Sequence, residues 1–101
     1  MSVYIIAQID IRDRDTYAKY QDGFAEVFAR YDGELLVVDD AAQVVEGEWP
    51  YSRTVVIRFP NADEAARWYG SPEYQAIAKH RLAASRGNAV LVQGFEPDAQ
   101  A

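Results

Sequence analysis

The stretch VYIIAQIDI, residues 3–11, is apolar on both faces over most of its length. Successive side chains of a β-strand point to opposite faces of the sheet. The odd positions here are all apolar, and the even positions carry Tyr4 and Ile6 before the polar Gln8 and Asp10. Both faces of the sheet that holds this strand therefore need cover. Since a chain of 101 residues has helices for one face only, the second face must meet a partner or enclose a pocket.

Composition narrows the possible classes of protein. Half of the residues are hydrophobic, so we expect one domain over residues 1–96, followed by a disordered tail over 97–101. Ten Lys and Arg against 16 Asp and Glu give a net charge of −6 with no concentrated basic patch. We therefore expect neither nucleic acid nor a membrane as a partner. With no membrane-length apolar run and no secretory signal, we expect the mature chain to begin at Met1 or Ser2.

The chain has no cysteine and a single histidine, His80. The lack of cysteine excludes disulfides, thiolate metal sites and thiol nucleophiles, and it fits a cytoplasmic location. One histidine cannot form a multi-histidine metal site within one chain, so we expect no metal and no cofactor. A haem-linked function would require His80 to face inward. Its position off the apolar stripe of its helix favours a solvated side chain instead.

Periodicity and capping residues predict strand, helix, strand twice over. Asp13 can cap a helix whose stripe includes Tyr17, Tyr20 and Tyr31, with Gly33 as its end. We expect these tyrosines to belong to the core and assign them no chemical role. The pattern predicts strands over residues 34–38 and 53–59, and an irregular segment or short hairpin arm over residues 43–49.

The second half begins with Asn61 and Glu64, which form a capping box. Ser71 and Pro72 then begin a further helix that we expect to run to about Arg86. Gly87 and Asn88 should turn the chain into a last strand over residues 89–95.

This order predicts an α+β, ferredoxin-like βαββαβ fold with an antiparallel sheet and helices on one face. We expect the first and third strands to be neighbours at the sheet centre and to run parallel to each other. The uncovered face should carry Tyr4, Ile6, Gln8, Asp10, Thr54, Val56, Arg58 and one alternation of Leu36, Val38, Val90 and Val92. Because so large an apolar patch rarely stays in water, the sequence predicts a homodimer that buries it, with space for a small molecule.

Three segments carry a family resemblance: EGEW (residues 46–49), RTVVIRFP (53–60) and ARWYGSPEYQ (66–75). The chain resembles the family called domain of unknown function 1330 (DUF1330) over about residues 3–95. The resemblance is carried by these segments together with Tyr17, Tyr20, Gly33 and Arg81. The resemblance implies a dimeric α+β barrel, a fold shared with cofactor-free monooxygenases, chlorite-dismutase-like haem proteins and small isomerases. It implies no reaction, because the family has no settled activity.

Arg81 falls inside the apolar stripe of its predicted helix, where a charged side chain needs a partner. One interpretation is a structural ion pair with Glu46, Glu48 or Glu73. The other is recognition of a carboxylate or enolate ligand.

Asp10 and Arg58 lie at equivalent ends of the two central strands and point to the uncovered face, so we expect them to be close enough for an ion pair. At the rim of the sheet this pair would be structural and worth about 0–1 kcal/mol. In a pocket it would supply a general base and an anion-binding group. Trp49 lies on a segment that could fold over a cavity or pack at a dimer edge.

These observations predict a cytoplasmic homodimer that binds a small aromatic or carboxylate compound between sheet and helices. If it is an enzyme, we expect proton transfer or cofactor-free oxidation, as in a cofactor-free oxygenase or isomerase. Asp10 would then be the base, with Arg58 or Arg81 stabilising the anion. Tyr4, Gln8, Trp49 and Val56 are the expected ligand-binding residues. The alternative is a non-catalytic binding or interaction module.

Overall fold

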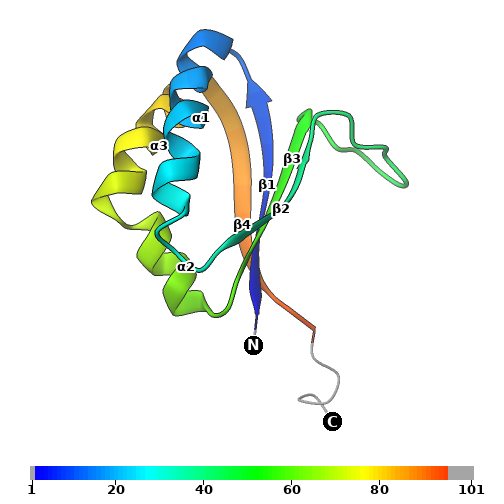
Figure 1. Ribbon diagram of the computed structural model, residues 1–101. Helices are drawn as coiled ribbons and strands as arrows, with labels where there is room; N and C mark the ends of the chain where they lie inside the picture. The colour runs from blue at the N-terminus through cyan, green and yellow to red at the C-terminus, as the bar shows by residue number, and fades with distance from the viewer. Residues whose placement is uncertain (1, 96–101) are drawn as a thin grey trace.

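The computed structural model describes residues 2–95. Four strands and three helices follow one another along the chain (Figure 1). Their bounds are β1 Val3–Ile11, α1 Arg14–Phe28, β2 Glu34–Asp39, β3 Arg53–Phe59, α2 Ala62–Tyr69, α3 Pro72–Ala84 and β4 Ser85–Gln93. The predicted tail over residues 97–101 lies outside the described residues.

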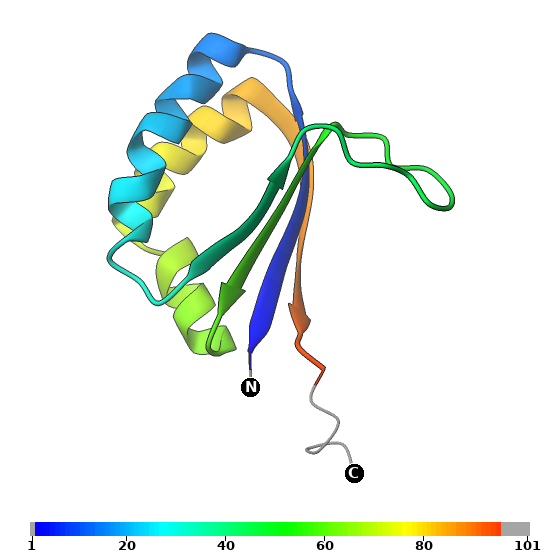
Figure 2. The same ribbon diagram turned by 45° about the vertical axis from the view of Figure 1, so that its right-hand side comes forward.

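The strands form one sheet in the order β2-β3-β1-β4, with every neighbouring pair antiparallel. Within residues 2–95, all three helices lie against one face and no helix covers the other (Figures 1 and 2). The predicted ferredoxin-like α+β fold is confirmed. The expectation that β1 and β3 run parallel was wrong, because Val3 is paired with Phe59 and Ile9 with Arg53. The crossover through α1 gives β1 and β2 the same direction, and the chain then reverses into β3.

The helices begin at the predicted caps. The side chain of Asp13 accepts a hydrogen bond from the backbone N–H of Thr16 at 3.1 Å, and Asn61 accepts one from Glu64 at 2.8 Å. Ser71 caps α3, with Pro72 in its first turn. Each cap satisfies a backbone donor that the first helical turn leaves without a partner.

Two element ends differ from the prediction. Helix α1 stops at Phe28, so Tyr31 lies outside it. Strand β4 begins at Ser85, directly after α3, and therefore contains Gly87. A Cβ at Gly87 would lie 2.7 Å from the backbone oxygen of Gln8. This glycine thus permits close approach of β4 to β1, where a turn was expected.

The core lies between the helices and the odd-numbered side chains of β1 and β3. Phe59 is fully buried and Trp68 is only 2% exposed, and their ring centroids are 5.4 Å apart. Phe28 packs edge-on against both of these rings. The aromatic cluster joins α1 and α2 to the end of β3, which fixes one wall of the space above the sheet.

The uncovered face carries most of the predicted apolar residues, with one exchange. A register shift between Leu35 and Val37 brings Val37 opposite Val56 and turns Val38 toward the helices, opposite Val55. Val37 therefore takes the place expected of Val38. An extra residue in one strand reverses the faces of all residues after it, which a simple alternation does not reveal.

Residues 40–52 form a loop without strand structure, which projects from the sheet on the side away from the helices (Figures 1 and 2). We call this loop the arm. It corresponds to the irregular segment expected over residues 43–49. Gly47, near its middle, has a φ of 75°, a conformation that glycine adopts at little cost. Val45 in the arm is 92% exposed. The arm thus places apolar side chains on the same side as the uncovered face.

Candidate ligand-binding cavity

A cavity of about 520 Å³ lies between the sheet and the helices, and all seven elements contribute to its wall. Its floor is the helix-facing side of the sheet, including Ile5, Ala7 and Ile57. Helix α2 contributes small side chains such as Ala62 and Ala66, which leave the space open. The lining is mostly apolar with a few polar groups, as is typical of small-molecule sites, and the volume falls within their usual range of ~300–1,000 Å³.

Tyrosines from two helices form the polar part of the wall. Tyr20 of α1 and Tyr74 of α3 are buried, and their hydroxyl oxygens are hydrogen-bonded at 3.0 Å. Tyr17 lies one turn before Tyr20, and the two rings are 5.5 Å apart. Burial raises the pKa of Tyr20 far above its ordinary value and also raises the pKa of Tyr17. Both phenols therefore keep their protons and serve as hydrogen-bond donors at neutral pH.

Arg81 of α3 is the cationic group on this side of the cavity. Its guanidinium carbon lies 5.7 Å from the centre of the Tyr20 ring. Burial by itself would lower the pKa of Arg81, but the phenols of Tyr74 and Tyr20 raise it, so the guanidinium stays charged. Cation and ring attract each other, although this contact brings no negative charge to the guanidinium.

The predicted ion pair of Arg81 with Glu46, Glu48 or Glu73 was wrong. Among residues 2–95, no carboxylate lies within ion-pair distance of its guanidinium. Glu73 instead accepts a hydrogen bond of 3.0 Å from the hydroxyl of Tyr31, and both glutamates of the arm are exposed. Glu73 lies in the first turn of α3, two turns before Arg81, and its side chain turns toward Tyr31 in the loop after α1. The arm leaves the sheet on the opposite side from α3, the helix that contains Arg81 (Figure 2).

Arg53, at the start of β3, is a second arginine in the wall, but its charge is balanced. Its Nε and Nη2 atoms donate to the two carboxylate oxygens of Asp40 at 2.6 and 2.9 Å. This paired contact raises the pKa of Arg53 and lowers that of Asp40. The same guanidinium lies 5.6 Å from the centre of the Tyr17 ring. Fork-to-fork pairing of this kind leaves little charge for a further anion.

Trp68 of α2 also lines the cavity, and the polar atom of its ring lacks a partner within residues 2–95. Its ring centroid lies 4.2 Å from that of Tyr74. The indole Nε1 is buried and has no hydrogen-bond partner among the described residues. An indole N–H only donates, and a buried donor without an acceptor costs about 1–3 kcal/mol, so such groups are uncommon in folded proteins.

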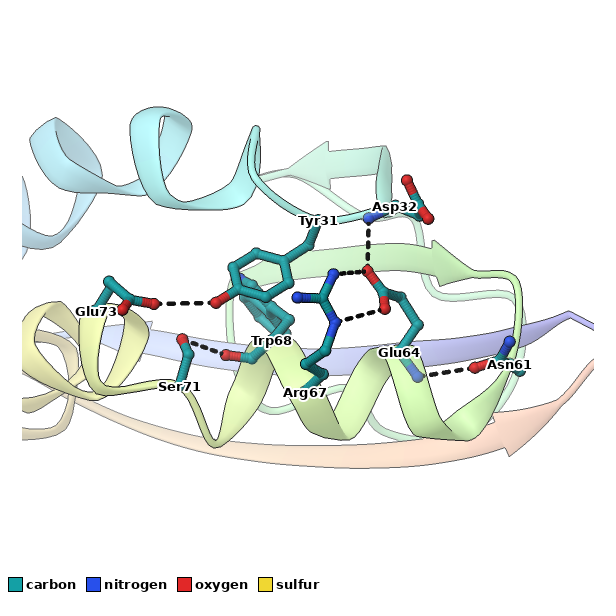
Figure 3. Close-up of polar contacts among 8 residues, drawn as sticks. All are labelled: Tyr31, Asp32, Asn61, Glu64, Arg67, Trp68, Ser71 and Glu73. Carbon is teal, nitrogen blue, oxygen red and sulfur yellow. Dashed lines mark hydrogen bonds and ion pairs between the residues drawn. The ribbon is translucent and has the colours of Figure 1, made fainter.

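Polar contacts on the outer side hold the wall around Trp68 (Figure 3). Glu64 of α2 accepts hydrogen bonds from Arg67 and from the backbone N–H of Asp32, the latter at 2.9 Å. Arg67 also lies 4.6 Å from the centre of the Tyr31 ring. Glu64 thus bonds to the loop after α1 and does not close the expected capping box. These contacts tie α2 to that loop and fix the position of the Trp68 ring.

Five predicted site residues lie on the uncovered face, away from the cavity. They are Tyr4, Gln8, Asp10, Val56 and Arg58. Arg58 forms an ion pair with Glu34, and Asp10 pairs with Arg12 at 3.2 Å.

The expected Asp10–Arg58 ion pair was therefore wrong. Arg58 lies opposite Tyr4, six positions along β1 from Asp10. At a rise of about 3.4 Å per residue, the two lie roughly 20 Å apart. The error follows from the direction of β3, because antiparallel strands place equivalent ends at opposite edges of the sheet.

Trp49 and His80 also lie outside this cavity. Trp49 lines a separate hollow of about 370 Å³ in the arm, and its indole donates to the hydroxyl of Thr54 at 2.9 Å. Thr54 belongs to the uncovered face, so Trp49 lies at the edge of that face. His80 is half-buried and is not part of the cavity wall. Of the predicted site residues, Arg81 alone lines the cavity between sheet and helices.

Sequence reasoning missed the phenols beside Arg81, Tyr20 and Tyr74, and the unpartnered indole of Trp68. The tyrosines were assigned to the core stripe, where they do lie. One available signal was that a buried tyrosine hydroxyl needs a hydrogen-bond partner, so tyrosines on two helical stripes predict a polar cluster where the helices meet. No signal in the sequence pointed to Trp68, because its lack of an acceptor is a property of the folded chain.

None of the helices in residues 2–95 is both long and apolar enough to cross a membrane. The same residues contain no group of three His, Cys, Asp or Glu side chains arranged to hold a metal ion. Fold and cavity together define a ferredoxin-like α+β domain with a ligand-sized, tyrosine-lined cavity. The family model described as domain of unknown function (DUF1330) matches residues 2–95, and the chain belongs to this family.

Solved structures share this fold at low sequence identity. A protein of unknown function from Rhodopseudomonas palustris has a TM-score of 0.79 and 16% identity, covering 95% of this chain and 84% of that one. The cofactor-independent oxygenase SnoaB from Streptomyces nogalater has a TM-score of 0.59 and 17% identity, covering 94% of each chain. A dimeric ferredoxin-like protein of unknown function from Thermobifida fusca has a TM-score of 0.64 and 17% identity, covering 93% and 92%. No curated protein matches the sequence significantly.

Proposed function

We propose that this protein is a homodimer that binds a small organic molecule in the cavity between sheet and helices. The observation that carries the proposal is Arg81, a charged side chain in a mostly apolar cavity with no carboxylate partner among the described residues. A partly buried charge of this kind is costly unless an opposite charge or several hydrogen bonds compensate it. A bound ligand would supply that compensation.

The homodimer part of the proposal rests on the uncovered face. Val37 and Val92 are each 38% exposed there and Val90 is 54% exposed, next to the half-buried Ile6 and Val56. A contiguous apolar face of this kind marks an interaction surface. Two copies packed face to face about a two-fold axis would cover it. The dimeric Thermobifida fusca protein, which has the same fold, supports this arrangement. Tyr4, Gln8, Asp10 and Arg58 then belong to the dimer face and take no part in the cavity.

Blocking the cavity tests ligand binding. Ala89 lines the cavity from β4 and is exposed to it, so Ala89→Phe adds a ring into the space without displacing core atoms. Ala83→Phe makes the same change at an exposed site of α3 outside the wall and serves as the control. Native mass spectrometry of the purified protein should detect a co-purifying small molecule in wild type and Ala83→Phe. Equal occupancy in Ala89→Phe would contradict the proposed site.

Cofactor-free oxygenation or isomerisation is the second candidate, and SnoaB supports it because a cofactor-independent oxygenase uses this fold. Among the described residues, the cavity wall contains no Asp, Glu or His. A reaction there would need a substrate that arrives already ionised, whereas simple binding has no such requirement. Conversion of the co-purified compound separates catalysis from binding, and oxygen consumption in proportion to that compound identifies an oxygenase.

A further inference from the structure

The described wall of this cavity contains no carboxylate and no imidazole, and two of its polar side chains can only donate hydrogen bonds. Arg81 has five N–H donors and accepts nothing, and the indole of Trp68 has one donor and no acceptor. Both side chains line the cavity, and the Trp68 N–H has no partner in residues 2–95. Of these two donor groups, Arg81 is the one that a ligand in the cavity can reach, because the indole nitrogen of Trp68 has no open surface.

The tyrosine pair adds a third donor. When two hydroxyls share one hydrogen bond, one of them donates and the other keeps a free proton. Tyr20 and Tyr74 are joined by one such bond of 3.0 Å. Because the Tyr20 ring lies 5.7 Å from the Arg81 guanidinium carbon, the spare proton and the positive charge lie on the same side of the cavity.

The net charge of the wall is that of one cation. Arg53 is matched by both carboxylate oxygens of Asp40, so Arg81 is the one charged group of the described wall that has no counter-charge. A ligand that neutralises it needs one negative charge. Around that charge the wall is aromatic and aliphatic, with Phe24, Trp68 and Ile57 among its members.

We infer that the cavity selects an apolar, ring-containing monoanion whose acceptor oxygens meet Arg81 and the spare proton of the Tyr20–Tyr74 pair. This inference rests on the proposed function and adds the chemical class of the ligand. Carboxylates, enolates and phenolates share the required chemistry. Because the described wall holds no carboxylate or imidazole to take up a proton, the ligand binds as the anion already formed in solution.

Three naphthalene probes of similar shape and different charge test the class of ligand. They are 1-naphthoate, its neutral amide 1-naphthamide, and the cation 1-naphthylmethylammonium. Titration calorimetry with the wild-type protein should give a Kd for the naphthoate at least about tenfold below that of the amide, since a charge-assisted bond is the stronger one. The ammonium probe should not bind.

The indole signals locate the probe. The chain has two tryptophans, so its ¹H–¹⁵N spectrum has two indole N–H signals, and Trp49→Phe identifies the one from Trp49. Naphthoate should shift the Trp68 signal and leave the Trp49 signal in place, because Trp49 already donates to Thr54 outside the cavity. A probe bound elsewhere on the protein would leave the Trp68 signal in place.

A matched pair of variants tests the charge. Arg81→Met keeps a similar stem without the guanidinium, and the Kd for naphthoate should rise to that of the amide. Arg86→Met removes the same charge from the exposed start of β4 and should bind naphthoate as the wild type does. The wild-type probe series decides the inference even if Arg81→Met fails to fold.

Two results would overturn the inference, and they differ in what they leave standing. If the amide or the ammonium probe binds as tightly as naphthoate and shifts the Trp68 signal, the ligand class is wrong while the cavity remains a binding site. If no probe binds and the Trp68 signal never moves, the proposed binding site is contradicted together with the ligand class.

Discussion

The two faces of the sheet hold their charged side chains in different ways. On the uncovered face, Arg58 pairs with Glu34 and Asp10 pairs with Arg12, and each pair lies at a strand end within reach of water. On the helix-covered face, Arg81 lies between aromatic rings and meets no carboxylate among the described residues. Charged residues that satisfy one another locally stabilise a surface and need no ligand. A charge that the fold leaves without a partner in a cavity indicates a site for one.

The apolar centre of the uncovered face provides the largest expected effect. Val56→Asp would place a carboxylate from each copy in the middle of the proposed interface, at a cost of about 3–5 kcal/mol for an unpaired buried charge. We expect a folded monomer by light scattering at micromolar concentration. Leu82→Asp adds the same charge at a 63% exposed position of α3 and should leave the dimer intact. A wild-type protein that is itself a folded monomer would rule out this role for the face.

Phe59 lies three residues after Val56 in β3 and faces the helices. A substitution there should lower the stability of the fold. Phe59 is fully buried against Phe28 and Trp68, so Phe59→Ala leaves a cavity among aromatic rings. We expect a loss of about 3–5 kcal/mol in the free energy of unfolding, measured by urea denaturation at fixed protein concentration. A loss below about 1 kcal/mol would mean that this end of the core is loosely packed.

The buried phenols give the covered face a distinctive dependence on pH. Because the pKa of Tyr20 is raised above its ordinary value of 10.0, the unfolded chain releases this proton first as the pH rises. The contribution of this pKa difference to the free energy of unfolding is complete below pH 10. Above pH 10 it declines by about 1.4 kcal/mol per pH unit. Tyr20→Phe should be less stable than wild type at pH 8, and the difference should shrink toward pH 11 in urea denaturation. A difference that stays constant would show that Tyr20 ionises normally.

The smallest expected effect concerns the separated charges of the uncovered face. A double-mutant cycle with Asp10→Asn and Arg58→Ala should give a coupling within about 0.5 kcal/mol of zero, because the two residues share no partner and lie far apart. The matched cycle with Glu34→Gln and Arg58→Ala tests a pair in contact and should give about 0.2–1 kcal/mol. A larger coupling for Asp10 than for Glu34 would contradict the observed register of β1 and β3.

Much of the fold was predictable because local patterns specify it. Two strand–helix–strand units, the caps at Asp13, Asn61 and Ser71, and a strand with two apolar faces lead to the ferredoxin-like arrangement. The errors lie where one residue changes the outcome. The shift between Leu35 and Val37 moves Val38 to the other face, and the chain passes from α3 into β4 without the expected turn at Gly87. Periodicity predicts whether a segment is a helix or a strand more reliably than it predicts the residue at which that segment ends.

The candidate site divides in the same way. The sequence determined that Arg81 falls on the inner stripe of its helix and that one face of the sheet stays uncovered, because both follow from spacing along a single element. The tertiary structure decided which groups surround Arg81, since Tyr20 beside it comes from α1 and its expected glutamate partners turn elsewhere. It also decided that Asp10 and Arg58 lie at opposite ends of the sheet. Contacts between distant segments depend on strand direction and helix packing, and these are settled only when the whole chain is folded.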